Sequence, residues 1–431
     1  MSAKLNNDTA LGNWAHGLAK ELWPFPRSLT GHGVRQTLDV LTREIPNLER
    51  HRVSTGYRAF DWEVPREWNL HRAWIETPDG SVICDTDHNN LHVVGYSLPT
   101  DQTLSLDALK NHLHADPGQP DAVPYVTSYY ADAWGFCLSQ NQLADLPDGE
   151  YRAVIDATLE PGHLDYADLI LRGETEQEIV FSTYLCHPSM ANNELSGIVV
   201  AAALARVIAA MPRRRYTYRF VFVPETIGTL VYLSTRHDHL KRHVAAGFVL
   251  TCVGDERGRS YLASRWEDTL ADRIALAAIA ETGKSYDRYS FVNRGSDERQ
   301  YCAPGIDLPF CSVMKSRYGT FPEYHTSNDN LEFVTPKGLA ESIAVHRRMI
   351  QLLEESRRPK ANVLGEPQLG RRGLYNNLSH KGSATGSRLM LDVLAYADGS
   401  WDIMELSDII GADVDAVSDA VDSLTAHGLL A

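Results

Sequence analysis

The six cysteines of this sequence form no CxxC pair. They are spread along 431 residues, at positions 84, 137, 186, 252, 302 and 311. Closely spaced cysteines mark disulfide frameworks and structural zinc ribbons, so the sequence argues against both classes. The six thiols are expected to be small, buried hydrophobic side chains.

The sequence also has little long apolar sequence and no excess of positive charge. The longest apolar stretch, residues 197–210, is shorter than the roughly 20 residues that a membrane helix needs. The first residues lack the pattern of a signal peptide. The formal net charge of −15 argues against binding to nucleic acid or to an anionic membrane. We therefore expect a cytoplasmic protein with no membrane and no nucleic-acid partner.

Apolar residues, by contrast, are abundant enough for more than one domain, at 43% of the chain. Changes in pattern along the chain predict five parts. They are an N-terminal part of the main domain at 1–52, a β-rich inserted domain at 53–150, the main α/β domain at 151–360, a linker at 361–387, and a small winged-helix-like domain at 388–431.

The main domain is expected to be α/β, with a mostly parallel sheet covered by helices. Apolar runs predict buried strands at 168–172, 178–186, 216–223, 246–253 and 308–314. Apolar residues at helical spacing predict helices at 195–211, 229–241, 266–282 and 336–356. Buried strands that alternate with helices are typical of a parallel sheet with both faces covered.

The last 44 residues predict three short helices, as in a winged-helix unit. A DNA-binding unit needs basic residues for phosphate contacts. Between Arg388 and Ala431, Arg388 is the one basic residue, against nine acidic residues. This tail is therefore expected to be a packing or oligomerisation element.

Two strand ends carry side chains that suit hydrolytic chemistry. His187 follows the strand of 178–186, and an Asx-rich turn with Asn193 comes next. Glu225 follows the strand of 216–223 and precedes a helix. Ligands of open α/β sheets bind at such strand ends. A carboxylate there can act as a general base toward metal-bound water, or it can simply favour the helix N-terminus.

Two later loops add further polar side chains. In the first loop, a guanidinium could hold a substrate carboxylate, or acids and arginines could neutralise one another. The candidate substrate-binding residues of this loop are Arg294, Asp297, Glu298 and Arg299. His325 lies in the second loop, and Asp329 four residues later could orient it.

Together these segments predict a hydrolytic zinc site. The two imidazoles of His187 and His325 and one oxygen ligand would hold the ion, with one position open to water. Glu225 would accept the proton of that water.

The segments CHPSMANNELSG, VPETIG, RGSDERQ and YHTSNDN resemble those of co-catalytic zinc aminopeptidases. More closely, nearly the whole chain resembles bacterial and archaeal aminopeptidase-like proteins that are often labelled polysaccharide-biosynthesis proteins. Those proteins combine a peptidase domain with a β-rich insertion and a C-terminal winged helix. The resemblance implies that His187 and His325 are the first and last metal ligands, that Asn193 holds the place of a bridging aspartate, and that Glu225 is the catalytic base.

The sequence departs from this pattern at several positions. Thr226 and Thr251 stand where carboxylate ligands are expected, and Ser189 stands where an aspartate would steady the first histidine. We therefore expect one zinc ion, as in the related glutaminyl cyclases, rather than two.

Asn193 is the sharpest departure, because an amide oxygen is a weaker zinc ligand than a carboxylate. Three explanations remain open. Metal binding is weak, or the natural residue was altered, or a nearby acid substitutes, namely Glu194, Asp297 or Glu298.

The main hypothesis is a zinc-dependent, aminopeptidase-like amide hydrolase acting on a small amino-acyl or peptide-like substrate. One alternative is a non-catalytic ligand-binding homologue with an incomplete metal site. Another is an acyl-transfer or cyclising enzyme of sugar or natural-product assembly. The expected partner is a small molecule or short peptide, and self-association into a homo-oligomer stays open.

Overall fold

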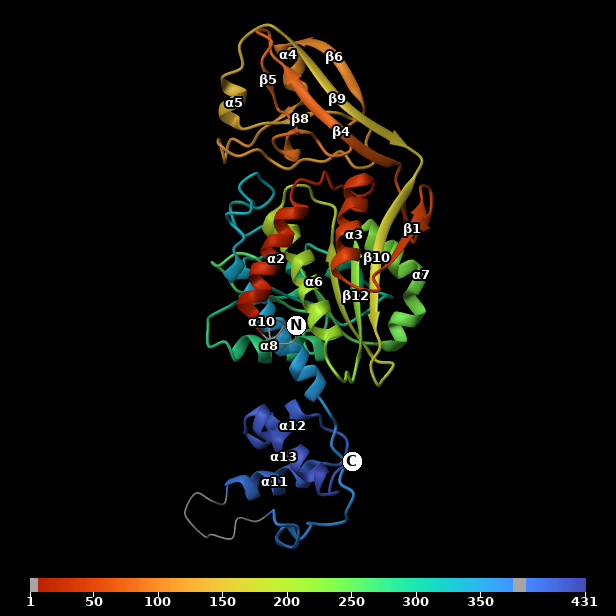
Figure 1. Cartoon of the computed structure of the whole chain (residues 1–431), viewed down its shortest axis with the longest axis vertical. Coiled ribbons are helices and arrows are strands. Elements are labelled where there is room, and N and C mark those ends of the chain that lie inside the picture. Colours follow the sequence, from red (N-terminus) through yellow and green to blue (C-terminus); the bar gives the residue numbers. More distant parts are fainter. Residues whose placement is uncertain (1–6, 375–384) are drawn as a thin grey trace. The chain divides into compact units, whose positions relative to one another are not determined.

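The computed structural model describes residues 7–374 and 385–431 (Figure 1). The chain divides into two compact units, Met1–Arg348 and Met349–Ala431. The candidate site lies in the first unit.

An eight-stranded sheet forms the centre of the first unit. Its central strands β12, β11, β13 and β16 are parallel, whereas β10 and β14 join antiparallel on either side. The predicted α/β fold is thus confirmed, and the sheet is mixed because its edges reverse direction. In spatial order β1-β10-β12-β11-β13-β16-β14-β15, the strands are Glu49–Ser54, His163–Leu171, Thr217–Val223, Glu178–Tyr184, Val244–Val249, Phe310–Met314, Ser260–Leu262 and Asp287–Tyr289.

Helices cover this sheet because the connections between its parallel strands are helical. The crossover from β11 to β12 and the crossover from β12 to β13 run in opposite directions along the sheet. Right-handed connections therefore place their helices on opposite faces. Figure 1 shows α2 beside α6, the helix of the first crossover. The helices of this unit are α2 (Asp8–Leu22), α3 (His32–Glu44), α6 (Ser196–Ala209), α7 (Ile227–His243), α8 (Leu270–Ala280) and α9 (Glu298–Tyr301), with a π-helical turn, η3, at Ala191–Leu195. The helix α10 (Pro336–Glu355) begins in this unit and ends in the second.

A second, four-stranded antiparallel sheet is inserted between β1 and β10. In the order β5-β4-β9-β6, its strands are Val82–Ile83, Glu67–Glu76, Glu150–Glu160 and Thr100–Ser105. The boundary expected after residue 150 falls at the start of β9, which stays in this sheet up to Glu160. Only Pro161 and Gly162 separate β9 from β10, so the chain changes sheets at a Pro-Gly turn.

Short elements complete the insertion. They are β2 (Arg58–Ala59), β3 (Trp62–Glu63), η1 (Asn90–His92), α4 (Leu106–Leu109), η2 (Lys110–His112), β7 (Leu113–His114), β8 (Phe136–Cys137) and α5 (Gln140–Ala144). One buried cluster includes Trp68 and Tyr151 of the insertion together with Tyr184 and Phe310 of the large sheet. The insertion and the α/β layer therefore share a hydrophobic core.

One helical segment among the described residues, Ala191–Ala209, is long and apolar enough to match a membrane helix in length and composition. It comprises η3 and α6, and 89% of it is buried inside the fold. Burial on all sides explains its continuous apolar sequence, as expected for the central helix of a large core.

The second unit contains η5 (Leu369–Arg372), α11 (Thr385–Tyr396), α12 (Ile403–Ile410) and α13 (Val414–Ala426). The three predicted helices are thus present and enclose their own core, which includes Val393, Leu406 and Leu424. The described part of the expected linker, residues 361–374, contributes the buried side chain of Leu369 to this core.

Candidate active site

The candidate residues follow the carboxyl ends of parallel strands and therefore lie at one edge of the sheet. His187 follows β11 by three residues, and Glu225 follows β12 by two. His325 comes from the loop after β16. Each of these segments holds a non-glycine residue in the left-handed region, with φ of 48° at Ser189, 63° at Thr226 and 56° at His325. Such strained backbone is concentrated at functional sites.

The rings of His187 and His325 approach each other, with centroids 5.5 Å apart. Tyr125, from the inserted domain, packs against both rings at 5.1 and 5.2 Å. The Nε2 atom of His325 is buried and has no hydrogen-bond partner among the described residues. Burial, with a smaller effect of His187, lowers the pKa of His325 to about 3. A neutral, unpartnered imidazole of this kind is suited to bind a metal ion.

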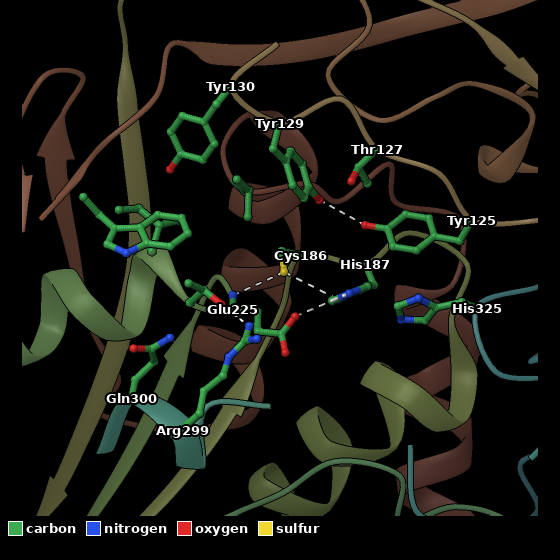
Figure 2. Close-up of a pocket in the computed structure, with 14 residues that line it drawn as sticks. Tyr125, Thr127, Tyr129, Tyr130, Cys186, His187, Glu225, Arg299, Gln300 and His325 are labelled. Atoms are coloured by element: carbon green, nitrogen blue, oxygen red, sulfur yellow. Dashed lines mark hydrogen bonds and ion pairs between the residues drawn. The ribbon is translucent and has the colours of Figure 1, made fainter. Parts of the chain in front are cut away.

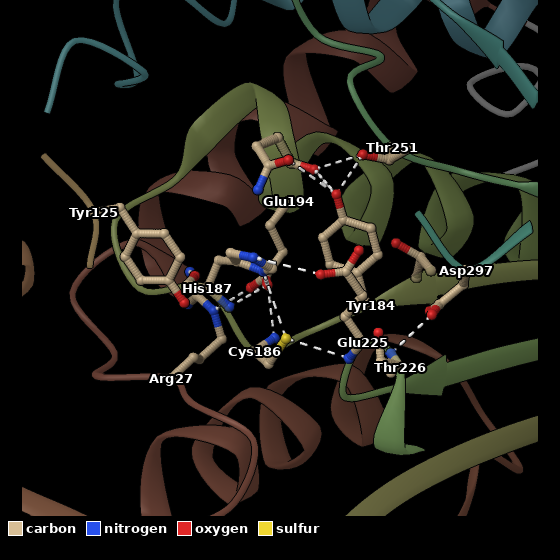
Figure 3. Close-up of polar contacts among 12 residues, drawn as sticks. Arg27, Tyr125, Tyr184, Cys186, His187, Glu194, Glu225, Thr226, Thr251 and Asp297 are labelled. Atoms are coloured by element: carbon tan, nitrogen blue, oxygen red, sulfur yellow. Dashed lines mark hydrogen bonds and ion pairs between the residues drawn. The ribbon is translucent and has the colours of Figure 1, made fainter. Parts of the chain in front are cut away.

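His187 is oriented by Glu194, as Figure 3 shows. Its Nδ1 atom lies 3.0 Å from Oε2 of Glu194, which also accepts hydrogen bonds from the backbone N–H groups of Cys186 and His187. With its Nδ1–H donated to Glu194, the neutral ring has Nε2 free as an acceptor. Burial alone would lower the pKa of His187, but the hydrogen bond and charge of Glu194 raise it above its ordinary value.

Arg27 lies behind this pair, fully buried. Its Nε donates to Oε1 of Glu194 at 2.8 Å, and its other nitrogens donate to the carbonyls of His187 and Leu22. No sequence pattern indicated Arg27, and Glu194 was expected only as one acid that could substitute for Asn193 at the metal. Glu194 takes the supporting role expected from residue 189, since Ser189 only accepts a hydrogen bond from Asn90. The tract containing Arg27, WPFPRSLTGHG, carries no local pattern that marks a buried ion pair.

Glu225 lies beside His187, with 3.7 Å between Oε2 of Glu225 and Nε2 of His187 (Figure 2). Its backbone N–H donates to the sulfur of Cys186 at 3.2 Å. Burial raises the pKa of Glu225, whereas the charges of His187 and Arg299 oppose that rise. A carboxylate with a raised pKa is suited to exchange protons near neutral pH.

Asn193 is held in a neutral hydrogen-bond cluster. Its Oδ1 accepts from the Tyr184 hydroxyl at 3.0 Å, and its backbone carbonyl accepts from the Thr251 hydroxyl at 2.7 Å. Its Nδ2 is buried without a partner among the described residues. The backbone N–H groups of Asn192 and Asn193 donate to Asp329, which thereby ties the His325 loop to this turn.

Of the four candidate residues around 294–299, Arg299 reaches the pocket and the others do not. Arg294 is exposed and stacks on Phe291. Glu298 is buried, where its Oε1 accepts hydrogen bonds from Gly295, Ser296 and Tyr318.

Asp297 is also buried, and it accepts a hydrogen bond from the backbone N–H of Thr226 at 2.8 Å. Burial and the nearby charge of Glu225 raise the pKa of Asp297 to about 7. Its position supports the Glu225 segment from behind and does not reach the pocket wall.

His187, Glu225 and His325 open onto a pocket of about 390 Å³. Figure 2 shows Arg299 and Gln300 on the side of Glu225, and a row of tyrosines on the other side. Aromatic residues of the insertion thus form part of the pocket wall. The remaining lining residues are Leu29, Trp62, Tyr125, Thr127, Tyr129, Tyr130, Cys186, Thr226 and Ile227.

The two histidines fit a single divalent metal ion. Because zinc–nitrogen bonds are about 2.0–2.1 Å long, two rings that share one ion have centres roughly 5–6 Å apart. The observed separation of 5.5 Å meets this condition. The unpartnered Nε2 of His325 and the carboxylate behind His187 are further features of a metal site. Asn193 offers only a neutral oxygen, so Glu225 is the one acid of the described pocket wall.

Known proteins are similar to this chain along nearly its whole length. Residues 16–356 match a family described as a domain of unknown function (DUF4910), and residues 357–431 match a winged helix-turn-helix family. A protein of Clostridium acetobutylicum, named for polysaccharide biosynthesis and an aminopeptidase-like domain, is 40% identical over 422 residues, covering 97% of this chain and 96% of its own.

Solved structures match as well. A crystal structure of a provisionally named peptidase from Clostridium acetobutylicum is 39% identical, with a TM-score of 0.92, and the match covers 100% of this chain and 98% of that chain. A zinc aminopeptidase from Bacillus subtilis is 12% identical, with a TM-score of 0.59 over 79% of this chain and 95% of that chain. At such low identity the second likeness shows the fold alone.

Proposed function

The chain belongs to the family described as domain of unknown function DUF4910, with an aminopeptidase-like fold and a C-terminal winged helix, and from this premise we propose that it is a zinc-dependent amide hydrolase. Its substrate is a small amino-acyl or peptide-like amide. The name of the Clostridium acetobutylicum relative favours a setting in polysaccharide assembly.

The observation that carries this proposal is the meeting of two imidazoles and one carboxylate on a single pocket. His187 and His325 are the residues that would hold the ion. Asn193 lies behind them, bound to the hydroxyl of Tyr184, whose ring packs against His187. When bound, zinc supplies Lewis acidity toward a carbonyl and toward water.

The protein's own groups perform the proton transfers. Glu225 takes a proton from the attacking water and returns it to the leaving amine, a task that its raised pKa supports. Glu194 and Arg27 keep Nε2 of His187 directed at the pocket. Tyr125, packed against both imidazoles, keeps bulk water from one side of them.

The test compares Glu225→Gln with Glu332→Gln, a change of an exposed carboxylate outside the pocket. Zinc content and hydrolysis of small amides are measured for the wild type and both variants, before and after chelation. We expect Glu225→Gln to lose at least 100-fold in turnover and Glu332→Gln to behave as the wild type. Unchanged turnover in Glu225→Gln would remove this residue from the role of base.

A second candidate function, ligand binding without catalysis, is favoured by the neutral cluster of Asn193, Tyr184 and Thr251. In this case the protein binds zinc weakly and shows no turnover. Asn193→Asp then raises zinc affinity, because a carboxylate replaces an amide beside the two histidines.

A further inference from the structure

The charged groups of the pocket wall determine which substrates it accepts. Among the described residues that line it, Glu225 is the one acid and Arg299 is the one arginine. A free α-ammonium group needs a carboxylate partner when it leaves water. Glu225 is already assigned to proton transfer, so no acid of the described wall remains to bind a substrate amine.

Neutral residues near the pocket strengthen this preference against a substrate with a free amine. Asn193, Thr226 and Thr251 add no charge to this edge of the sheet. The acids behind the wall are already held by donors of the protein, namely Glu194, Asp297 and Glu298. The hydroxyls of Tyr184 and Thr251 form hydrogen bonds to each other and to oxygen atoms of Asn193, and all three groups are neutral. The site therefore favours an anionic substrate over a cationic one.

Arg299 is positioned to receive a carboxylate. Its NH2 atom donates to the Thr226 hydroxyl at 2.6 Å, which fixes the guanidinium beside the Glu225 segment. Its Nε is buried and has no hydrogen-bond partner among the described residues. Gln300, the next residue of α9, lines the same part of the pocket and adds a second donor (Figure 2). A fixed guanidinium with donors to spare binds carboxylates in paired hydrogen bonds.

The opposite wall suits an uncharged acyl group. Tyr125 and Tyr129 share a hydrogen bond of 3.0 Å between their hydroxyls, and Trp62 packs edge-on against Tyr130 with centroids 5.9 Å apart. Trp62 and Tyr130 remain 41% and 55% exposed, so their rings are accessible to a ligand. Aromatic faces of this kind bind apolar or ring-containing groups.

We propose, on the basis of the hydrolase function proposed above, that the substrate is an N-acylated amino acid or an N-blocked short peptide that ends in a free carboxylate. Arg299 binds the carboxylate on the amine side of the scissile bond, next to Glu225, which protonates that amine. The aromatic wall holds the acyl side. Water adds its oxygen to the acyl carbon, the C–N bond breaks, and the products are a carboxylic acid and a free amino acid.

The test uses substrates that differ only in the carboxylate. N-benzoyl derivatives of glycine, leucine and phenylalanine are compared with their decarboxylated N-benzoyl amines, and leucine p-nitroanilide serves as the free-amine probe. The zinc-loaded full chain is assayed as the wild type, Arg299→Met, Arg299→Lys and Arg294→Met. Arg294 is the matched control, because it lies in the same segment but is exposed and off the pocket.

We expect kcat/KM for at least one N-benzoyl amino acid to exceed that of its decarboxylated counterpart at least tenfold. Arg299→Met lowers kcat/KM for the N-benzoyl amino acid at least tenfold more than for the decarboxylated compound and so removes this preference, Arg299→Lys restores part of it, and Arg294→Met leaves it unchanged. A merely structural role for Arg299 would instead lower both activities by the same factor.

Faster hydrolysis of leucine p-nitroanilide than of every N-benzoyl amino acid would overturn this inference and leave the proposed hydrolase function standing. If no amide is hydrolysed, the hydrolase function fails. In that case, calorimetric binding of N-benzoyl amino acids to the zinc-free wild type that is lost in Arg299→Met still supports the carboxylate site. Equal binding to the wild type and to Arg299→Met, or no binding to the wild type, overturns the carboxylate site.

Discussion

At the scale of single residues, the site depends on a buried ion pair that supports a histidine. Arg27 and Glu194 are both fully buried and lie 167 residues apart in the chain. Removing one member of a buried pair leaves the other without a partner, which is costly. Glu194 is therefore required both for the fold of this edge and for the direction of His187.

Glu194→Gln tests this support. An amide can keep one hydrogen bond to the His187 segment, but it removes the negative charge that makes Nε2 a better metal ligand. We expect zinc affinity, measured by competition with a chelator, to fall about 10- to 100-fold. Glu332→Gln should leave it unchanged. Equal affinities in the two variants would contradict the role given to Glu194.

A second residue-scale prediction concerns pH. His346 of α10 is buried, its Nδ1–H donates to the Ser342 carbonyl at 2.8 Å, and its Nε2 has no partner among the described residues. Burial lowers its pKa to about 4. In the unfolded chain a histidine has a pKa of about 6.5, so the unfolded state binds more protons between these values. Stability from this group is therefore present above pH 6.5 and is lost as the pH falls to 4.

The measurement is the free energy of unfolding in urea for the wild type and His346→Leu. Between pH 6.5 and 4, the wild type should lose up to about 3 kcal/mol more than the variant. Parallel pH profiles would show that His346 does not titrate as described.

At the scale of elements, the close approach of α6 to the sheet edge positions the histidine turn. Gly197, in the first turn of α6, lies so close to β13 that an added Cβ would be 2.2 Å from the Leu250 carbonyl oxygen and 2.6 Å from the Thr183 hydroxyl. Leu250 directly follows β13 and Thr183 lies in β11, so the added Cβ would collide with the backbone and a side chain of the central sheet. The glycine is therefore needed for packing rather than for an unusual backbone angle.

Gly197→Ala should destabilise the protein by at least about 1–3 kcal/mol, because the collision involves backbone. Gly17→Ala in α2 is the matched control, since an added Cβ there meets no atom within 4 Å. That change should stabilise by about 0.5–1 kcal/mol, because alanine favours helices over glycine. Thermal unfolding of both variants measures the difference, and a neutral Gly197→Ala would show that α6 can move from the sheet.

At the scale of the whole molecule, the chain joins an aminopeptidase-like unit to a winged helix-turn-helix domain that carries nine acidic residues and one arginine from Arg388 to its end. In helix-turn-helix proteins the second helix of the motif enters the major groove of DNA. Here that position is held by α13, which follows α12 after a left-handed turn at Gly411. The exposed residues Asp415, Asp419 and Asp422 occupy this helix, and it contains no lysine or arginine.

We therefore predict that the full-length protein does not bind duplex DNA. Non-specific DNA binding arises from lysine and arginine contacts to phosphates and strengthens at low salt. At 50 mM salt, fluorescence anisotropy should give a Kd weaker than about 10⁻⁴ M. Tighter binding that weakens with added salt would contradict this prediction and show that the protein binds nucleic acid.

Local sequence patterns determined much of the fold and half of the candidate site. Apolar runs and helical spacing located the central strands and the helices after them, because these elements are buried and leave a strong period in the sequence. Placing His187 and Glu225 together required only the rule that parallel strands end at one edge, whereas His325 lies in a loop beyond the end of β16. That rule uses only the N-to-C direction of each strand, which follows from the order of residues in the sequence.

The tertiary structure alone decided the rest. It separated Arg299, which reaches the pocket, from Arg294, which does not, because side-chain direction in an irregular loop has no period. It paired Arg27 with Glu194, brought the tyrosines of the insertion to the pocket, and gave Asn193 neutral partners. Each of these depends on contacts between segments far apart in the chain, and the energy of such contacts is set by the folded arrangement rather than by local sequence.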